Sequence, residues 1–242
     1  MSKNLTQTLL IISPHPDDLE IGMGGTVASE VALANKVVSV VLTDGRRSQR
    51  SFDCSDEEMA EIRNREVKAA ANLLGIKDLY CLALPNLYSP KNQETLFQEL
   101  SDLLIKYQPD RVYLPHPKLD RHPSHSLGAE LVLAVIVKLI KGEKLTPLRL
   151  WAYEVWGLFP SWDLLVDISQ FVEQKREAIN AHQSQVTDIA YADGVLGLNR
   201  WRAVFSDPHH LPKNAYAEVF ISLDSYLSSW AKKTPTSRKR SE

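Results

Sequence analysis

Short apolar runs alternate with longer amphipathic segments along the chain from Thr8 to Lys141. The apolar runs are bounded by turn or breaker residues, and they predict buried strands at Thr8–Ser13, Val37–Leu42, Leu79–Ala83 and Arg111–Leu114. The segments that follow them carry apolar residues at helical spacing, and they predict helices at Gly22–Asn35, Glu57–Leu74, Glu94–Tyr107 and Leu127–Lys141. Four strand–helix units in succession indicate an α/β fold, Rossmann-like, with a mostly parallel sheet and helices on both faces.

The last hundred or so residues are less regular. They predict strands at Arg149–Val155, Leu164–Ile168 and Glu218–Leu223 and a helix at Gln170–His182. The Gly-, Pro- and His-containing segment Asp193–Asn214 is expected to be a long loop. Because no linker divides the chain, we expect one domain over residues 1–231. Residues 232–242 hold five basic residues and one acidic residue, and we expect a disordered basic tail there.

Charge and hydropathy narrow the class of protein. The chain has 30 acidic and 28 basic residues, a net charge of −2, which disfavours a nucleic-acid partner. No run approaches the roughly 18 uninterrupted apolar residues of a membrane span, so we expect no integral membrane segment. The first residues lack a secretory signal and the two cysteines form no disulfide framework, so we expect a cytoplasmic protein with reduced thiols. The sequence leaves open whether identical chains form a homo-oligomer.

A cluster of charged residues directly follows the first predicted strand. It reads Pro14-His15-Pro16-Asp17-Asp18-Leu19-Glu20. In open α/β sheets the carboxyl end of a strand is where ligands bind. Three carboxylates beside a buried strand are costly unless a cation neutralises them, and a divalent metal ion would do so. The alternative is an acidic surface loop, which the flanking prolines and the strand before it disfavour.

A second cluster follows the fourth predicted strand, at the same edge of the sheet. It contains Pro115-His116-Pro117 and then Asp120-Arg121-His122-Pro123-Ser124-His125. Of His122 and His125, one can reach a metal ion while the other stays near the reacting group. Two histidines and an aspartate leave the fourth position of a zinc ion open, as in catalytic sites. A closed structural zinc site is disfavoured because neither cluster contains cysteine. The remaining aspartate is then available as a base, which is the outline of metal-assisted hydrolysis.

These residues resemble the PIG-L/LmbE-like family of zinc-dependent N-acetylglucosaminyl deacetylases. Residues 14–20 resemble its PHPDDxE signature, and residues 122–128 are similar to its HPDHxxxG signature. Weaker matches follow in family order over nearly the whole chain. They are Arg63-x-x-Glu66 with Ala70-Ala71 and Leu74-Gly75; Lys175, Ala178, His182 and Ser184-Gln185; and Tyr216-Ala217-Glu218-Val219-Phe220.

The resemblance implies a role for each matching residue. His15, Asp18 and His125 would ligate one zinc ion. Asp17 would be the general base that takes a proton from the attacking water, and His122 would polarise or protonate the tetrahedral intermediate, stabilising its oxyanion as a cation. Arg63 would help to bind the sugar. The implied fold is Rossmann-like, and the implied reaction removes the acetyl group from an N-acetylglucosamine unit, releasing acetate and a free amine.

Two positions depart from the family pattern, and three further features are substrate-binding candidates. Ser124 stands where the family usually has Asp, so Asp120 is an alternative charged neighbour for His122. Asn86 stands where many members have an Asp that contacts the sugar. Arg46, in the turn Thr43–Arg47, is a candidate for binding an anionic carrier, or else part of a charged turn. The remaining candidates are Trp151, Trp156 and Trp162, which stack on a sugar or pack in the core, and His209-His210, which line the pocket or lie on the surface.

Three functions compete at this stage. The leading hypothesis is a zinc-dependent N-deacetylase that acts on an N-acetylated amino sugar in a glycoconjugate. The second is a metal hydrolase of another acyl-amide substrate. The third is a catalytically weak carbohydrate-binding protein, since Ser124 interrupts one motif; the intact His15, Asp17, Asp18 and His125 disfavour it.

Overall fold

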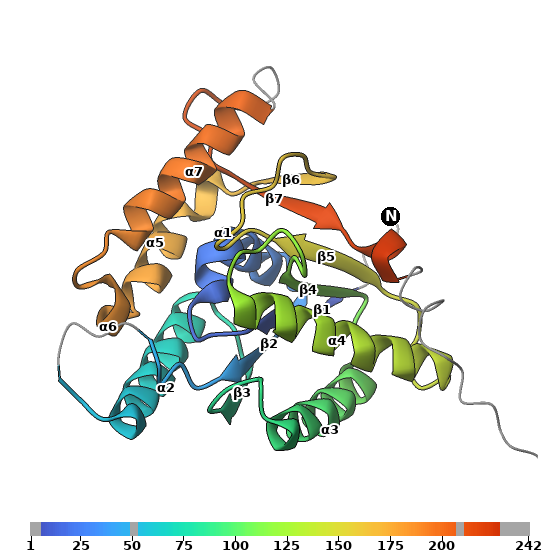
Figure 1. Cartoon of the computed structure of the whole chain (residues 1–242). Coiled ribbons are helices and arrows are strands. Elements are labelled where there is room, and N and C mark those ends of the chain that lie inside the picture. The colour runs from blue at the N-terminus through green and yellow to red at the C-terminus, as the bar shows by residue number, and fades with distance from the viewer. Residues whose placement is uncertain (1–5, 49–52, 207–210, 228–242) are drawn as a thin grey trace, which may run out of the picture.

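The computed structural model describes residues 6–48, 53–206 and 211–227. Within them, seven strands form one sheet in the order β3-β2-β1-β4-β5-β7-β6 (Figure 1). The strands are β1 (Thr8–Ser13), β2 (Lys36–Thr43), β3 (Asp78–Leu84), β4 (Arg111–Pro115), β5 (Arg149–Tyr153), β6 (Leu164–Asp167) and β7 (Ala217–Ser222). The first five are parallel to one another, whereas β7 runs antiparallel to both β5 and β6. The mostly parallel α/β sheet that the sequence predicts is confirmed.

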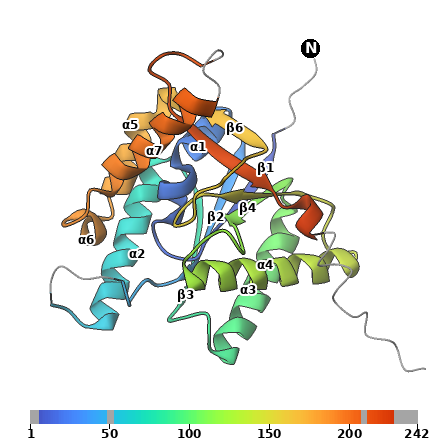
Figure 2. The ribbon, with the colours of Figure 1, turned by 45° about the horizontal axis from the view of Figure 1, so that its top comes forward.

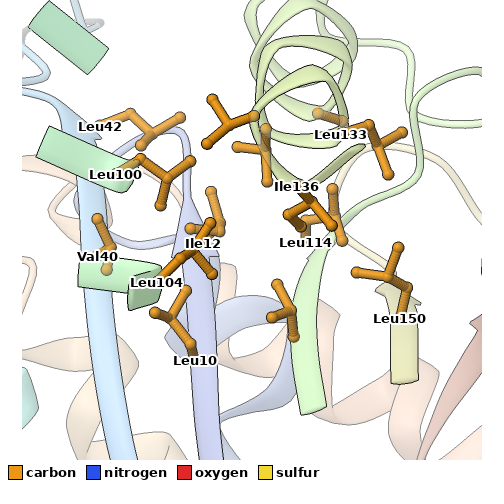
Figure 3. Close-up of a cluster of buried hydrophobic side chains, with 14 of the residues drawn as sticks. Leu10, Ile12, Val40, Leu42, Leu100, Leu104, Leu114, Leu133, Ile136 and Leu150 are labelled. Atoms are coloured by element: carbon orange, nitrogen blue, oxygen red, sulfur yellow. The ribbon is translucent and has the colours of Figure 1, made fainter. Parts of the chain in front are cut away.

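Helices cover both faces of this sheet (Figures 1 and 2). They are α1 (Asp18–Ala32), α2 (Asp56–Leu73), α3 (Pro90–Tyr107), α4 (Pro123–Lys141), α5 (Val172–Asn180), α6 (Gln183–Val186) and α7 (Tyr191–Ser206), with a 3-10 turn at Ser169–Phe171. Along β1 the side chains alternate between two cores: Leu10 and Ile12 pack with α3 and α4 (Figure 3), whereas Leu9 and Ile11 pack with α1 and α2. A strand buried on both faces is why these residues form a continuous apolar run.

The strand order reverses between β1 and β4, and this places the two charged clusters together. β1 pairs with β2 on one side and with β4 on the other, in parallel in both cases. The chain leaves the carboxyl ends of β1 and β4 in opposite lateral directions, which opens a crevice between the two connections. Residues 14–17 lie in the first connection and residues 116–122 in the second. The fold therefore brings together residues more than a hundred positions apart.

Capping residues close to the helix in sequence fix both ends of α2. Ser55 caps α2 through a reciprocal capping box with Glu58, and Gly75 takes the left-handed conformation after its end, with φ +75°. Both α1 and α4 begin about four residues earlier than the apolar pattern predicts, because charged residues of the two clusters form their first turns. The two helices therefore begin within the two clusters that the sequence singles out.

One expectation is wrong: the segment Asp193–Asn214 is not a long loop, because α7 occupies Tyr191–Ser206. Gly194 and Gly197 suggested irregular structure, yet a Cβ at either would meet no atom within 4 Å, so both lie where the helix needs no side chain. Arg202 instead fixes α7 to the body through a buried ion pair with Glu154. The pair His209-His210 and the basic tail at 232–242 lie outside the described residues.

Among the described helices, α4 alone is long and apolar enough to cross a membrane by length and composition. More than half of its apolar window, 56%, is buried inside the protein, where Val132, Leu133 and Ile136 pack against the sheet. Its apolar character is thus explained by packing in the core.

Candidate active site at the carboxyl edge of the sheet

Three side chains that follow the carboxyl ends of β1 and β4 place their nitrogen and oxygen atoms close to one another. His15 Nδ1 lies 2.9 Å from His125 Nε2. The carboxylate of Asp18 lies 3.4 Å from His15 Nδ1 through Oδ2 and 3.2 Å from His125 Nε2 through Oδ1. His15 comes from the loop after β1, Asp18 from the first turn of α1 and His125 from the first turn of α4. His125 and Asp18 are almost completely buried.

This donor set fits a tetrahedral metal ion. Ligands at about 2.0–2.1 Å from zinc in a tetrahedron lie about 3.4 Å from one another, close to the three separations seen here. Two imidazole nitrogens that face each other can share at most one proton, whereas a cation between them satisfies both lone pairs. The ring of His122 is also near, and the three imidazoles offer nitrogens within 4.8 Å of one another. Two donor sets are therefore geometrically available, and they differ in whether Asp18 or His122 is the third ligand.

A buried carboxylate holds His125 from behind. Asp120 Oδ2 lies 3.1 Å from His125 Nδ1, and Oδ1 accepts a hydrogen bond from the backbone N–H of His122. A carboxylate on the far nitrogen of a metal-binding histidine fixes its ring and makes it a stronger ligand. The carboxylate of Asp120 thus contacts the ring of His125 and the backbone of His122, and its charge also opposes the lowering of the His122 pKa, in line with the charged neighbour that the sequence suggests.

The electrostatics of this cluster favour a positive charge. Burial lowers the pKa of His125, but Asp18 and Asp120 outweigh it and raise the pKa to about 10. Burial opposes ionisation of Asp18, yet His125 and His15 hold its pKa well below the usual range. Since a buried cluster with ionised carboxylates calls for a cation, a metal ion suits the site as well as protons do.

Asp17 lies beside the cluster and is held by Arg63. Arg63 Nη2 is 3.1 Å from Asp17 Oδ1, and the Arg63 side chain is 1% exposed. Asp17 occupies the N-cap position of α1, but its side chain makes no capping hydrogen bond, so the carboxylate stays available to the pocket. Within the described residues, Nε and Nη1 of Arg63 have no hydrogen-bond partner. Arg63 therefore contacts the candidate base directly and keeps donors to spare at the pocket wall.

Ser124 connects two of the imidazoles. Its Oγ lies 2.8 Å from His15 Nε2 and 2.8 Å from His122 Nδ1. If Nδ1 of His15 is a ligand, its Nε2 carries a proton and donates to Oγ, and the hydroxyl then donates to His122 Nδ1. These two hydrogen bonds leave the ring proton of His122 on Nε2. Burial first, then the neighbouring His15 and His125, lower the pKa of His122.

A pocket of about 490 Å³ opens over these residues. Its polar floor consists of His15, Asp17, Asp18, Arg63, His122 and Ser124, and Asn86, Arg46, Tyr88, Trp156, Gln185 and Tyr191 are among the residues that line the rest. Trp156 is 49% exposed, and its ring lies edge-on to that of Tyr191 with centroids 6.2 Å apart. Aromatic rings with a polar edge suit the apolar face of a sugar ring. By contrast, Trp151 and Trp162 pack against the two cores.

The two remaining substrate-binding candidates line this pocket with part of their polar groups already engaged. Arg46 Nε lies 2.8 Å from Asp44 and Nη1 lies 3.0 Å from Glu57, so two carboxylates neutralise its charge. The Oδ1 of Asn86 accepts hydrogen bonds from the backbone N–H groups of Tyr88 and Ser89, which leaves its amide nitrogen to reach a ligand.

Comparison with known proteins agrees with this site. The family model "PIG-L: GlcNAc-PI de-N-acetylase" matches residues 10–136, which include both clusters. The chain belongs to the PIG-L family. This family is metal-dependent, and the three imidazoles of His15, His122 and His125 could hold a metal ion.

Several relatives of this chain carry deacetylase names. The diacetylchitobiose deacetylase of Thermococcus kodakarensis is 31% identical over 191 residues, which is 75% of this chain and 71% of that protein. A Bacillus anthracis protein named "Probable N-acetyl-alpha-D-glucosaminyl L-malate deacetylase 2" is 26% identical over 80% of this chain and 90% of its own length. The inhibitor complex of N,N'-diacetylchitobiose deacetylase from Pyrococcus horikoshii superimposes with a TM-score of 0.76 at 28% identity, covering 92% of this chain and 85% of that one.

The weaker PIG-L motifs pair with one another in space. Glu66 of the Arg63-x-x-Glu66 motif accepts hydrogen bonds from the backbone and hydroxyl of Ser184, at 2.6 and 2.7 Å. Lys175 forms a buried ion pair of 2.6 Å with Glu218. Sequence reasoning quoted these residues only as matches, since nothing in a single sequence indicates that segments this far apart meet. It also passed over Tyr88 and Tyr191, because an isolated tyrosine carries no local signal for a pocket.

Asp120→Asn should weaken metal binding about 10–100-fold, the usual effect of removing such a supporting carboxylate. The amide keeps one oxygen for the His122 backbone but turns a donor toward His125 Nδ1, where an acceptor is needed. Competition against a chelator of known affinity measures the change. Zinc affinity equal to that of the wild type would contradict the role assigned to Asp120.

Proposed function

We propose that this protein is a zinc-dependent hydrolase that removes the N-acetyl group from an N-acetylglucosamine-type amino sugar in a glycoconjugate, releasing acetate and a free amine. The observation that carries the proposal is the convergence of His15, Asp18 and His125 at tetrahedral spacing, with Asp17 beside them at the floor of a sugar-sized pocket. Relatives of up to 31% identity carry the names of amino-sugar deacetylases, which supports the same reaction here.

His15, Asp18 and His125 would hold the zinc ion. Their separations favour this set, and Nδ1 of His122 is already engaged with Ser124. Bound zinc supplies Lewis-acid polarisation of the amide carbonyl and lowers the pKa of water to about 7. Three protein ligands leave one position open, which is the arrangement of catalytic sites.

The protein's own groups would carry the proton transfers. Asp17 accepts a proton from the attacking water, and the Arg63 contact at 3.1 Å keeps its carboxylate oriented. His122, with its proton on Nε2, donates a hydrogen bond to the oxygen that gains negative charge, and the proton that Asp17 took from the water passes to the leaving nitrogen. One water is consumed, the C–N bond breaks, and acetate and the amine leave.

The carrier of the amino sugar is best sought among neutral glycosides. The walls of the pocket include Trp156, Tyr88 and Tyr191, whose rings suit a second sugar. The charge of Arg46 is matched by Asp44 and Glu57, which disfavours an anionic carrier at that point. The alternative is a hydrolase of another acyl amide, because the same metal-binding and catalytic residues would support that reaction.

An acetate-release screen over N-acetylglucosaminides, with zinc present, tests the proposal. The panel holds the free sugar, a β-linked disaccharide, a malate conjugate and simple acyl amides, and both acetate and free amine are measured. We expect equimolar acetate and amine from the amino sugars, with the disaccharide ahead of the malate conjugate. Activity confined to the simple acyl amides would support the alternative and refute the amino-sugar assignment.

Trp156→Ala should raise KM about tenfold for a disaccharide substrate, equivalent to about 1.4 kcal/mol of binding, while kcat changes little. The reason is that the ring contacts substrate away from the reacting bond and binds ground state and transition state alike. Phe205→Ala, on the exposed surface of α7, is the matched control. A lowered kcat with unchanged KM would contradict a stacking role.

We also propose a cytoplasmic location, as expected for a sequence whose two cysteines, Cys54 and Cys81, make no disulfide framework. Cell fractionation with an antibody against the protein tests it.

A further inference from the structure

Helix α1 is broken within its first half, close to the site. Met23 has φ −149° and ψ 22°, which is not helical, so the helix consists of a short first segment and a longer second one. The first segment begins with Asp18 and has Asp17 as its N-cap. Sharp kinks in helices have identifiable causes, among them a side chain inserted into the hydrogen-bond ladder.

The inserted group here is the ion pair of Lys175 and Glu218. In a continuous helix the N–H of Gly25 would bond to the C=O of Ile21. Instead, Gly25 N donates to Glu218 Oε1 at 3.0 Å, and Ile21 O accepts from Lys175 Nζ at 2.9 Å. Lys175 Nζ and Glu218 Oε1 are themselves 2.6 Å apart. The pair thus replaces the backbone hydrogen bond between Gly25 and Ile21 with three contacts in series: Gly25 to Glu218, Glu218 to Lys175, and Lys175 to Ile21.

The charges of this pair match the ends that they contact. Glu218 also accepts from Thr26 N at 2.7 Å, so its carboxylate caps the start of the second segment. The ammonium of Lys175 lies at the carbonyl end of the first segment. Negative charge at a helix start and positive charge at a helix end are the favourable combinations. Both side chains are 0% exposed, so no water competes for these contacts.

The surroundings fit the broken helix closely. A Cβ on Gly24 would lie 3.2 Å from Lys175 Cγ, and one on Gly25 would lie 2.7 Å from Ile168. A Cβ on Gly22 would overlap the ring of Tyr153 at 2.2 Å. The three glycines therefore allow the broken segment to lie directly against the residues that fix it.

We propose that Lys175 and Glu218 are positioning residues of the active site, which hold α1 in its broken form and thereby aim Asp17 and Asp18 at the metal and the substrate. The inference rests on the proposed function, because it takes Asp17 and Asp18 as the base and a metal ligand. A regular helix through Met23 would carry the first segment along the axis of the second and displace both carboxylates. The pair acts on the reaction only through this orientation.

If Lys175 and Glu218 served only to stabilise the fold, removing the pair would change the stability of the protein and leave the site unchanged. Replacing a buried ion pair with apolar residues of similar volume is often neutral or stabilising. The double variant Lys175→Met/Glu218→Met also allows Gly25 N and Ile21 O to bond directly. We therefore expect the double variant to stay folded while α1 straightens, so that the geometry of the site changes and the stability of the fold does not.

The experiment measures zinc affinity by chelator competition, acetate release at saturating zinc, and the melting temperature. For Lys175→Met/Glu218→Met we expect a melting temperature near that of the wild type, zinc affinity lower by about 10–100-fold, and kcat lower by at least about tenfold. The matched control is Glu30→Gln/Arg111→Met, which removes the ion pair at the other end of α1 and should leave zinc affinity and kcat unchanged.

Two results would overturn the inference. One is a folded double variant with the zinc affinity and kcat of the wild type. If the double variant does not fold, Glu218→Asp serves instead, because it keeps the charge but withdraws the carboxylate from Gly25 and Thr26; a folded Glu218→Asp protein with unchanged zinc affinity also overturns it. A wild-type protein that neither binds zinc nor releases acetate would instead refute the proposed function on which the inference rests.

Discussion

Asp17→Asn should lose about 10²–10⁴-fold in kcat, the contribution typical of a positioned general base, while keeping its zinc. The amide has the shape of the carboxylate and can still accept the hydrogen bond from Arg63 Nη2, now at 3.1 Å. It cannot take up a proton from water. The change therefore removes one chemical capability and leaves the geometry in place. Steady-state acetate release, with zinc content measured on the same sample, checks the result.

The same substitution far from the site provides the control for Asp17. Asp110 accepts a hydrogen bond from Thr8 N at the opposite edge of the sheet, and Asp110→Asn should leave kcat unchanged. Near-normal turnover in a zinc-replete Asp17→Asn protein would contradict the role of Asp17 as the base. Loss of zinc from Asp17→Asn would show instead that Asp17 belongs to the metal-binding set.

Alanine at each proposed ligand should abolish zinc binding at protein concentrations where the wild type holds about one ion per chain. His15→Ala, Asp18→Ala and His125→Ala each remove one of three donors, and with the zinc the acetate release disappears. His122→Ala is the decisive comparison, because this ring belongs to the alternative set of three imidazoles. We expect His122→Ala to keep its zinc and to lose turnover. Metal analysis after gel filtration measures all four variants.

The reverse pattern for the ligand variants would overturn the assignment. A zinc-free His122→Ala protein together with a zinc-replete Asp18→Ala protein would establish His122 as the third ligand. Full occupancy in His15→Ala or His125→Ala would contradict either set. Circular dichroism separates these outcomes from unfolding, since His125 and Asp18 are buried and their loss also affects packing.

The regular part of the fold follows from local sequence. β1 was predicted with its observed ends because an apolar run stops at Pro14. The end of α2 was predicted because Gly75 supplies the left-handed residue that terminates a helix. α7 was not predicted, because Gly194 and Gly197 lower helix propensity by about 1 kcal/mol each relative to Ala, and its compensation is a buried ion pair between Arg202 and distant Glu154.

The candidate site was predictable where its residues are contiguous in sequence. The residues around His15 and His125 follow two strands of one sheet, so their meeting follows from topology. Contacts that depend on tertiary packing were not predictable: the bond from Ser124 to two imidazoles, the support of His125 by Asp120, and the exposure of Trp156 in the pocket. The sequence gives no reason to prefer one of the three tryptophans as a sugar-binding residue, and only their burial in the structure distinguishes Trp156 from the other two.

Zinc titration of chelator-treated protein tests the central claim most directly. The protein is stripped of metal, zinc is added in increments, and acetate release from an N-acetylated disaccharide is measured at each step. Release should begin from a negligible level, rise linearly and reach its plateau at about one zinc per chain, the stoichiometry of a site with three protein ligands. Full acetate release from the metal-stripped protein, unaffected by added zinc, would contradict the account.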